Sequence, residues 1–270
     1  MRLILAAILL SLLPLTAQAG EGLRALDTAD SVRGLEGVGR LDIGGASGQR
    51  GFCTATLVSP TQVLTAAHCV FDPATGSPQP TEDMTFRAGL RHGEEEARRR
   101  VRRMVIDPGY RYGGSPTPGS VATDLALLEL DRALELPQVR PFPASGRLAT
   151  GDVVQVVSYA RHRAEAASRE DDCTVLARDA RVLALSCSVD FGSSGAPVFV
   201  ATASGLRIVS VISAKGVWDD RPAAFAVTVE AGLERLRREF ARATNLAPVR
   251  KTLRVGEEGT GTIRFLRPGG

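Results

Sequence analysis

Residues 54–69 read TATLVSPTQVLTAAHC, two short apolar runs separated by a Ser-Pro-Thr cluster. Short runs of Val, Leu and Thr bounded by turn-forming residues are typical of β-strands. The pattern extends in both directions, from about residue 34 to residue 229. It predicts strands at residues 54–58, 63–65, 101–106, 125–130, 153–158, 182–187, 197–200, 207–212 and 225–229. We therefore expect an all-β fold.

Two segments near the C-terminus depart from this pattern. In residues 228–245, Leu233, Leu236 and Phe240 recur at helical spacing among Arg and Glu, which predicts an amphipathic helix packed against the domain. Residues 251–266 contain two short apolar runs around a Gly-Glu-Glu-Gly turn, which indicates a hairpin in the tail. Three segments rich in Pro and Gly or in charge are expected to be surface loops: residues 72–83, 107–123 and 160–172.

The composition excludes several classes of protein. With 270 residues, 44% of them hydrophobic, the chain has enough apolar material for one or two globular domains and is neither disordered nor fibrous. The net charge of +3 is small and does not imply a nucleic-acid partner. One basic run, residues 98–103, follows three glutamates at 94–96. We interpret it as the exposed face of a strand, with a site for an anionic surface or substrate as the alternative.

Residues 1–19 have the pattern of a secretory signal peptide. Arg2 precedes an apolar run at 3–13, and Ala17-Gln18-Ala19 supplies small residues before Gly20. We expect cleavage after Ala19 and a secreted or periplasmic location. The alternative is an uncleaved anchor, but Pro14 interrupts the run well before the roughly 20 apolar residues that a membrane span needs. Stable membrane insertion after cleavage is therefore not expected.

Export determines how the four cysteines are interpreted, because thiols oxidise outside the cytoplasm. Four cysteines allow three pairings, and two local bridges, Cys53–Cys69 and Cys173–Cys187, are the simplest choice. Neither pair has the C-x-x-C spacing of a zinc site, and no histidine lies near the second pair. No metal and no other cofactor is expected.

Three segments carry residues with catalytic potential. His68 follows a predicted strand and adjoins Cys69, which would hold the imidazole rigidly. Asp124 opens the apolar run at 125–130, where a buried carboxylate needs a partner such as an imidazole N–H. The small residues at 192–197, GSSGAP, form a turn that would expose a serine hydroxyl among converging backbone N–H groups. Each segment alone is more often structural than catalytic.

Together, the three segments resemble the chymotrypsin/trypsin family of serine proteases. That family carries a T-A-A-H-C box, an Asp before a hydrophobic strand and a G-D-S-G-G-P box, in that order. Here residues 65–69 match the first box, Asp124 opens residues 124–128 (DLALL), and residues 192–197 resemble the third. The bridge of Cys53 to Cys69 and the IDPGY stretch at 106–110 also match. The resemblance covers roughly residues 34–245. Within the family, the chain is similar to bacterial, secreted members without a zymogen-type catalytic box.

The resemblance implies a fold and a set of roles. It implies two packed six-stranded antiparallel β-barrels, at about 34–135 and 136–229, with the amphipathic helix at about 229–245. Residues 20–33 are then an N-terminal segment or a short pro-segment, and 246–270 a C-terminal tail. His68 would be the general base, Asp124 its orienting partner and Ser194 the nucleophile, while the N–H groups of Gly192 and Ser194 would form the oxyanion hole.

Two departures from the family pattern bear on activation and packing. Ser193 replaces an aspartate that, in the digestive enzymes, pairs with a freshly cut N-terminal amine. We infer that the oxyanion hole forms without zymogen cleavage. Secreted full-length protein that stayed inert until cut near residue 34 would contradict this inference. Ala196 replaces a glycine, which is a milder change.

The substrate-binding positions that the resemblance implies are Ser188, Ser213 and Lys215. Ser188 would lie at the base of the primary pocket, and it is not the acid that would select Lys or Arg. Ser213 would belong to the strand edge that pairs with the substrate backbone. Lys215 replaces a glycine of many relatives at the pocket mouth. It would either narrow the pocket, attract an acidic side chain or point into solvent.

The sequence therefore predicts a secreted serine endopeptidase that acts on proteins or peptides. An α/β-hydrolase is excluded, because its histidine follows its serine, whereas His68, His92 and His162 all precede Ser194. Two alternatives remain. One is a catalytically silent binding module with a protease fold, and the other is a membrane- or polyanion-binding protein that acts through residues 98–103. The sequence does not indicate an oligomeric state.

Overall fold

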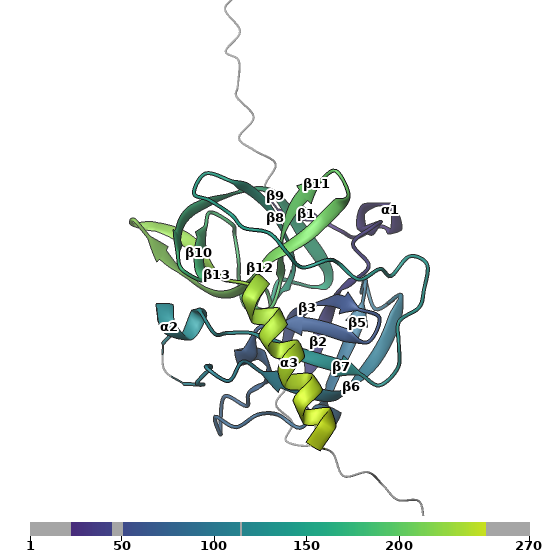
Figure 1. The fold of residues 1–270 in the computed structure, drawn as a ribbon. Coiled ribbons are helices and arrows are strands. Elements are labelled where there is room, and N and C mark those ends of the chain that lie inside the picture. Colours follow the sequence, from purple (N-terminus) through teal and green to yellow (C-terminus); the bar gives the residue numbers. More distant parts are fainter. Residues whose placement is uncertain (1–22, 45–50, 114, 247–270) are drawn as a thin grey trace, which may run out of the picture.

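The computed structural model describes residues 23–44, 51–113 and 115–246, which form two β-sheets and one long C-terminal helix (Figure 1). The first sheet is a closed barrel in the order β2-β3-β4-β7-β6-β5. Its strands are β2 (Val38–Ile43), β3 (Gly51–Ser59), β4 (Gln62–Thr65), β5 (Met84–Ala88), β6 (Ala97–Ile106) and β7 (Ala126–Leu130). All neighbouring strands are antiparallel.

The second sheet has the order β1-β9-β10-β13-β12-β11-β8, with an additional pairing of β8 and β9 that joins its strands into a ring. Its strands are β1 (Arg24–Ala25), β8 (Val153–Ala160), β9 (Arg163–Asp179), β10 (Val182–Leu185), β11 (Pro197–Thr202), β12 (Gly205–Trp218) and β13 (Arg221–Thr228). The short β1 adds to β9 outside the ring. The expected fold class, all-β with a chymotrypsin-like pair of sheets and a C-terminal helix, is confirmed.

The helical elements are short except the last: α1 (Ala29–Val32), η1 (Ala67–Val70), η2 (Thr81–Asp83), α2 (Pro118–Val121) and α3 (Glu230–Leu246). The predicted helix at 228–245 is therefore confirmed, and Leu233, Leu236 and Phe240 are all buried. Figure 1 shows α3 crossing from the second sheet toward β6 and β7 of the first. No helix among the described residues is both long and apolar enough to cross a membrane.

Side chains of alternate residues pack into different cores, because successive residues of a strand point to opposite faces. In β7, Ala126, Leu128 and Leu130 fill the inside of the first barrel. The intervening Leu127 packs, with Leu125 before the strand, into a second core between the two sheets and under α3. A third core fills the second sheet. Because β7 serves two cores, the start of the strand is held from both sides.

All nine strands predicted from the sequence are present, but the loop predicted at residues 160–172 is wrong. Most of that segment belongs to β9, which pairs with β8 from Val153↔Thr174 to Ala160↔Arg163. Its charged residues misled the prediction because several have partners in the folded chain, as in the ion pair of Glu165 Oε1 with Arg40 Nη1 at 2.9 Å. The predicted signal peptide and the predicted tail hairpin lie outside the described residues.

The basic run at 98–103 lies on β6, and neighbouring acids neutralise several of its cations. Arg98 pairs with Glu95 at 2.6 Å, and Arg102 and Arg103 pair with Glu129 at 2.9 and 3.1 Å. The arginines of these pairs are 32% to 65% exposed, and such partly solvated pairs add little stability. They do reduce the positive potential that an anionic partner would need, which favours the interpretation as a solvated strand.

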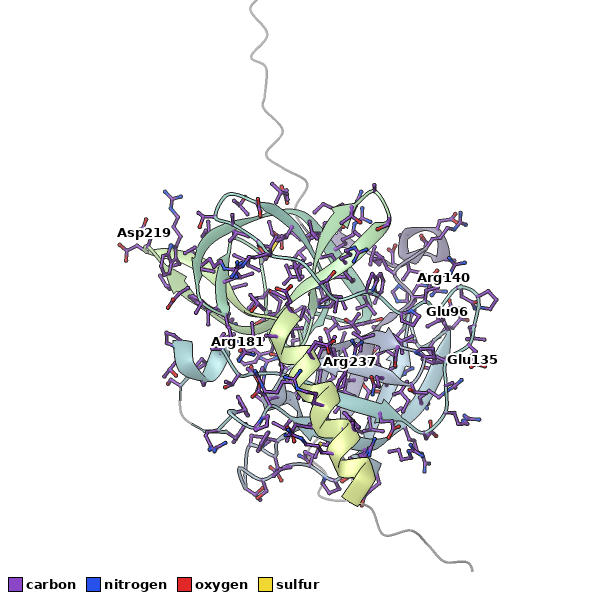
Figure 2. All side chains as sticks on the ribbon, viewed as in Figure 1. Glu96, Glu135, Arg140, Arg181, Asp219 and Arg237 are labelled. Atoms are coloured by element: carbon purple, nitrogen blue, oxygen red, sulfur yellow. A yellow bond between two sulfur atoms is a disulfide. The ribbon has the colours of Figure 1, made fainter. Side chains whose placement is uncertain are left out.

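Asp107 anchors α3 to the loop that leads to β7. Only 2% of its side chain is exposed, and it accepts hydrogen bonds from Arg235 of α3 and from the backbone N–H of Gly109. Arg181, labelled beside α3 in Figure 2, lies 3.6 Å from the same carboxylate. A buried carboxylate with two cationic neighbours therefore joins the helix to both sheets.

We expect Asp107→Asn to lower the free energy of unfolding by about 2 kcal/mol, because it leaves two guanidinium groups without their counter-charge. The larger cost of a fully buried pair does not apply, since Arg181 and Arg235 are 27% and 30% exposed. Urea unfolding would measure the change. Asp131→Asn, at an exposed acid that follows β7, is the control. An unchanged urea midpoint in Asp107→Asn would contradict the assignment.

Candidate active site

His68 and Asp124 meet because of the register between two strands. The sequence places His68 three residues after the end of β4, in η1, and Asp124 two residues before β7. These strands are antiparallel, with Thr65 opposite Ala126, so the residues that follow β4 lie beside those that precede β7. The end of one buried strand and the start of its neighbour therefore bring an imidazole and a carboxylate together.

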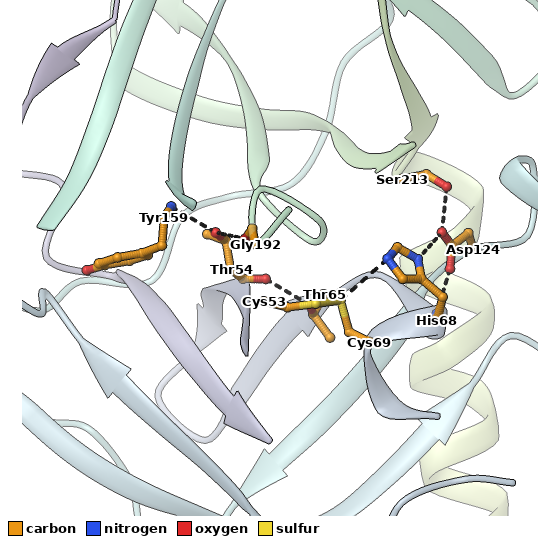
Figure 3. The surroundings of a disulfide bond; sticks show 9 residues. All are labelled: Cys53, Thr54, Thr65, His68, Cys69, Asp124, Tyr159, Gly192 and Ser213. Carbon is orange, nitrogen blue, oxygen red and sulfur yellow. Dashed lines mark hydrogen bonds and ion pairs between the residues drawn. A yellow bond between two sulfur atoms is a disulfide. The ribbon is translucent and has the colours of Figure 1, made fainter. Parts of the chain in front are cut away.

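The Asp124 carboxylate is 3% exposed and accepts hydrogen bonds from three groups (Figure 3). His68 approaches it twice, with its backbone N–H at 2.8 Å and its Nδ1 at 2.7 Å. Ser213 of β12 donates its hydroxyl to Oδ2 at 2.5 Å. The acceptor bonds satisfy the buried charge and fix the proton of the imidazole on Nδ1. Nε2 of His68 is then the nitrogen with a free lone pair.

The turn that carries Ser194 docks on the first barrel. The Ser194 carbonyl accepts from the backbone N–H of Thr54 at 2.9 Å, and the Thr54 hydroxyl donates to the Gly192 carbonyl at 2.9 Å. Gly195 has a φ of +80°, and a Cβ there would collide with Thr65 Oγ1 and the Thr54 carbonyl. Glycine is therefore required at 195, so that the serine turn can approach the strands that position His68.

The backbone N–H groups of this turn fall into two sets. Those of Ser193, Gly195 and Ala196 donate to the carbonyls of Asp190, Ile212 and Ser193 at 2.9, 2.8 and 3.0 Å. Across the described ranges, the N–H groups of Gly192 and Ser194 make no hydrogen bond. A pair of unpartnered amides two residues apart, one of them belonging to the serine whose hydroxyl lies beside them, is the arrangement of an oxyanion hole.

The predicted catalytic residues line one cleft of about 650 Å³. Its walls include His68, Asp124, Ser194, Ser213 and Lys215. Ser188 lies elsewhere: it lines a neighbouring hollow of about 570 Å³ that shares Val189 and Lys215 with the cleft. The cleft thus brings together the predicted triad with Ser213 and Lys215, whereas Ser188 lines the neighbouring hollow and Gly192 lines neither.

Lys215 at the rim of the cleft forms an ion pair with Asp190 at 2.8 Å. Its Nζ also lies 4.6 Å from the centre of the Phe191 ring, and the Arg161 guanidinium lies 4.4 Å from the same ring. The hydrogen bond from Lys215 lowers the pKa of Asp190 below its ordinary value. Lys215 is therefore held at the rim by an acid and an aromatic ring. The sequence interpretation had not identified Asp190, although it lies only four residues before Ser194.

Both predicted disulfides, Cys53–Cys69 and Cys173–Cys187, are present. The first packs against the imidazole, with Cys69 Sγ 3.9 Å from His68 Nε2 (Figure 3). Cys53, His68 and Cys69 lie close enough together for a metal site, but the two sulfur atoms are bonded to each other and are not thiolate ligands. The cluster therefore braces the histidine.

Comparison with known proteins identifies the family. A model of the trypsin-like peptidase domain matches residues 53–205, a range that contains His68, Asp124 and Ser194. The chain belongs to the trypsin-like peptidase family. A Modular serine protease of Drosophila melanogaster is 39% identical over 93 residues, which are 32% of this chain and 14% of that protein. The chain thus matches only a small part of that relative.

A solved structure of a Glu endopeptidase in complex with MPD superimposes with a TM-score of 0.64. It covers 82% of this chain and 98% of that one at 17% identity, which shows the shared fold. This trypsin-like peptidase differs from the family box at Ser193, which is wholly buried. Its hydroxyl bonds to Ser158, a residue that no sequence motif indicated.

Proposed function

We propose that the chain is a serine endopeptidase in which Ser194 is the nucleophile, His68 the general base and Asp124 its orienting partner. The observation that carries the proposal is the Asp124–His68 contact in the same cleft as Ser194, whose own N–H, like that of Gly192, is unpartnered. A buried carboxylate that fixes the imidazole tautomer serves proton transfer, and the free amides serve a developing oxyanion.

The reaction follows from these positions. Nε2 of His68 accepts the Ser194 hydroxyl proton while Oγ forms a bond to the scissile carbonyl carbon. The carbonyl oxygen gains negative charge, which the N–H groups of Gly192 and Ser194 stabilise. His68 then gives the proton to the leaving amine as the C–N bond breaks, and an acyl-enzyme remains. Water, deprotonated by His68, attacks this ester, and Ser194 recovers its proton as the acid product leaves.

Labelling and turnover test the proposal together. A fluorophosphonate probe is expected to modify the secreted protein at Ser194, and the unlabelled protein is expected to hydrolyse casein. Peptide mapping of the labelled protein would locate the adduct. A catalytically silent module with a protease fold would neither react with the probe nor cleave casein. A polyanion-binding protein would instead show salt-sensitive association that is indifferent to the probe.

The proposal includes a location outside the cytoplasm, in the periplasm or in the medium. It is supported by the two disulfides and by the leader-like residues 1–19. In that location the bridge at Cys69 stays oxidised and continues to hold the neighbouring His68. The partner is a protein or peptide substrate bound along β12, whose Ser213, Ala214 and Lys215 line the cleft.

We further propose that the enzyme prefers an acidic side chain in its primary pocket. Lys215, Arg161 and Arg111 supply positive charge around the rim, and Asp190 is the acid that partly offsets them. Lys215 and Asp190 are 52% and 35% exposed, so their ion pair is weak enough for a substrate carboxylate to displace. The fold match to a Glu endopeptidase is consistent with such a pocket.

We expect peptides with Glu before the scissile bond to give a higher kcat/KM than matched peptides with Arg, Ala or Leu. Lys215→Ala is expected to reduce the ratio of kcat/KM for the Glu peptide to kcat/KM for the Leu peptide by about tenfold. A loss of this size is expected when one solvent-exposed charge-assisted hydrogen bond is removed. A fluorogenic substrate panel would measure both values. Asp220→Ala, near the tip of the β12–β13 hairpin that Asp219 marks in Figure 2, is the control. Preference for Arg would contradict the acidic pocket.

A further inference from the structure

Ser193 links the catalytic turn to the second sheet. Its side chain is fully buried, and its hydroxyl donates to Ser158 Oγ of β8 at 3.2 Å. The Oγ of Ser193 also accepts from the backbone N–H of Asp190 at 3.3 Å. The Ser193 hydroxyl therefore bonds both within the turn, to Asp190, and to the neighbouring strand β8, through Ser158. Ser193 is the residue between Gly192 and Ser194, whose two N–H groups are assigned to the oxyanion hole.

A guanidinium completes this link. Arg163, at the start of β9, donates through Nη1 to the Ser158 carbonyl at 2.6 Å. Nη1 and Nη2 each also donate to Ser158 Oγ at 3.2 Å. A cation with two bonds to one hydroxyl fixes the rotamer of that hydroxyl, and with it the direction of the bond from Ser193. Arg163, Ser158 and Ser193 form one hydrogen-bonded chain.

The charged groups that face Arg163 are Glu170 of β9 and Asp190 of the turn. Glu170 is itself buried and accepts from the backbone N–H of Ser188 at 2.8 Å. Burial raises the pKa of Glu170 and lowers the pKa of Arg163. The two acids offset part of the desolvation of Arg163, which favours the charged guanidinium at this place in the second sheet.

The turn has further attachments to the same hairpin. Arg161, in the connection between β8 and β9, donates its backbone N–H to the Phe191 carbonyl at 2.8 Å. Gly192 lies so close to the hairpin that an added Cβ would be 3.1 Å from Ala160 Cα. The segment from Ser188 to Ser193 is therefore bound at its start, middle and end by the hairpin of β8 and β9.

We propose that Arg163 is a positioning residue that sets the oxyanion hole from within the chain, acting through Ser158 and Ser193. The proposal rests on the serine endopeptidase function above. It assigns to an internal cation the ordering of the turn that, in the digestive enzymes, a new N-terminal amine performs. Because the cation is part of β9, the hole is formed as soon as the second sheet folds.

The N-terminal part of the described chain is consistent with this assignment. Residues 23–33 are an integral part of the domain: β1 pairs with β9, and Leu26 and Val32 are buried in the core between the sheets. A cut near residue 34 would remove both buried side chains. Processing there is thus expected to destabilise the protein instead of activating it.

The test compares kcat of the secreted protein with that of Arg163→Met and Arg163→Lys on one peptide substrate. Arg163→Met is expected to lower kcat by about tenfold to a hundredfold with little change in KM, somewhat less than loss of a whole oxyanion donor. Arg163→Lys is expected to retain most of kcat at pH 7 and to lose it at a pH below about 10, the ordinary pKa of lysine, because burial lowers the pKa of a cation at this position. The parent keeps its kcat there, because arginine stays charged.

Circular dichroism at each pH would separate these effects from unfolding. If Arg163→Met does not fold, Ser193→Ala replaces it, with an expected several-fold loss of kcat and an intact Arg163–Ser158 contact. Arg237→Met, at a surface arginine that pairs with Glu234 on α3, is the control.

Unchanged kcat in folded Arg163→Met or Ser193→Ala would overturn the proposal. So would loss of the parent's activity near pH 8, where an α-amino group titrates. Failure of the parent itself to hydrolyse peptide or react with fluorophosphonate would instead refute the proposed function.

Discussion

Ser194→Ala is expected to lower kcat on a peptide substrate by about six orders of magnitude, to the level of the residual binding and oxyanion contributions. The methyl group fills the same space as the serine Cβ but offers no Oγ to form the acyl-enzyme. His68 and Asp124 would remain in contact, because neither depends on Ser194 for its position. KM is expected to change little, since the cleft keeps its shape.

Measurement of so large a loss requires that no parent enzyme contaminate the variant. Active-site titration with a fluorophosphonate probe before the assay would give the fraction of reactive sites. Ser204→Ala, in the exposed turn between β11 and β12, is the control, because this serine does not line the cleft. If Ser194→Ala hydrolysed peptide within tenfold of the parent, another nucleophile would have to be sought and the triad abandoned.

Elements that depend on local pattern could be predicted from the sequence. The apolar runs in β3, β4 and β7 are short and bounded by turn residues, so the local sequence pattern alone gives the positions of these strands. The register of β4 with β7 then places His68 beside Asp124. Leu233, Leu236 and Phe240 have a helical period that no strand shares, which is why α3 was predictable.

The brace behind the catalytic turn could not be predicted, for a physical reason. Arg163 lies in residues 160–172, whose many charged side chains led to the prediction of a surface loop. Its role appears only when β9 pairs with β8 and the guanidinium reaches Ser158. The partner of Lys215 was hidden in the same way, since Asp190 is 25 residues distant in sequence and meets it across the cleft rim. Such contacts depend on side-chain directions in the folded sheet.

Asp124→Asn is the second change with a large expected effect, a loss of kcat on the order of 10⁴-fold near neutral pH. The carboxylate accepts from both the backbone N–H and Nδ1 of His68. An asparagine has one acceptor oxygen. If that oxygen keeps the backbone N–H, the amide NH₂ faces Nδ1 and selects the imidazole tautomer with its proton on Nε2. That nitrogen then cannot accept the Ser194 proton.

The fold is expected to survive Asp124→Asn, because the variant preserves volume and a hydrogen bond to the backbone of His68. Its rate of fluorophosphonate labelling should fall with kcat, since both need the same deprotonation, whereas a peptide inhibitor should bind as before. Asp131→Asn, which changes an exposed acid after β7, is expected to leave kcat unaltered. Equal activity of Asp124→Asn and the parent would show that the imidazole is oriented without the carboxylate, and Asp124 would then be only the polar cap of β7.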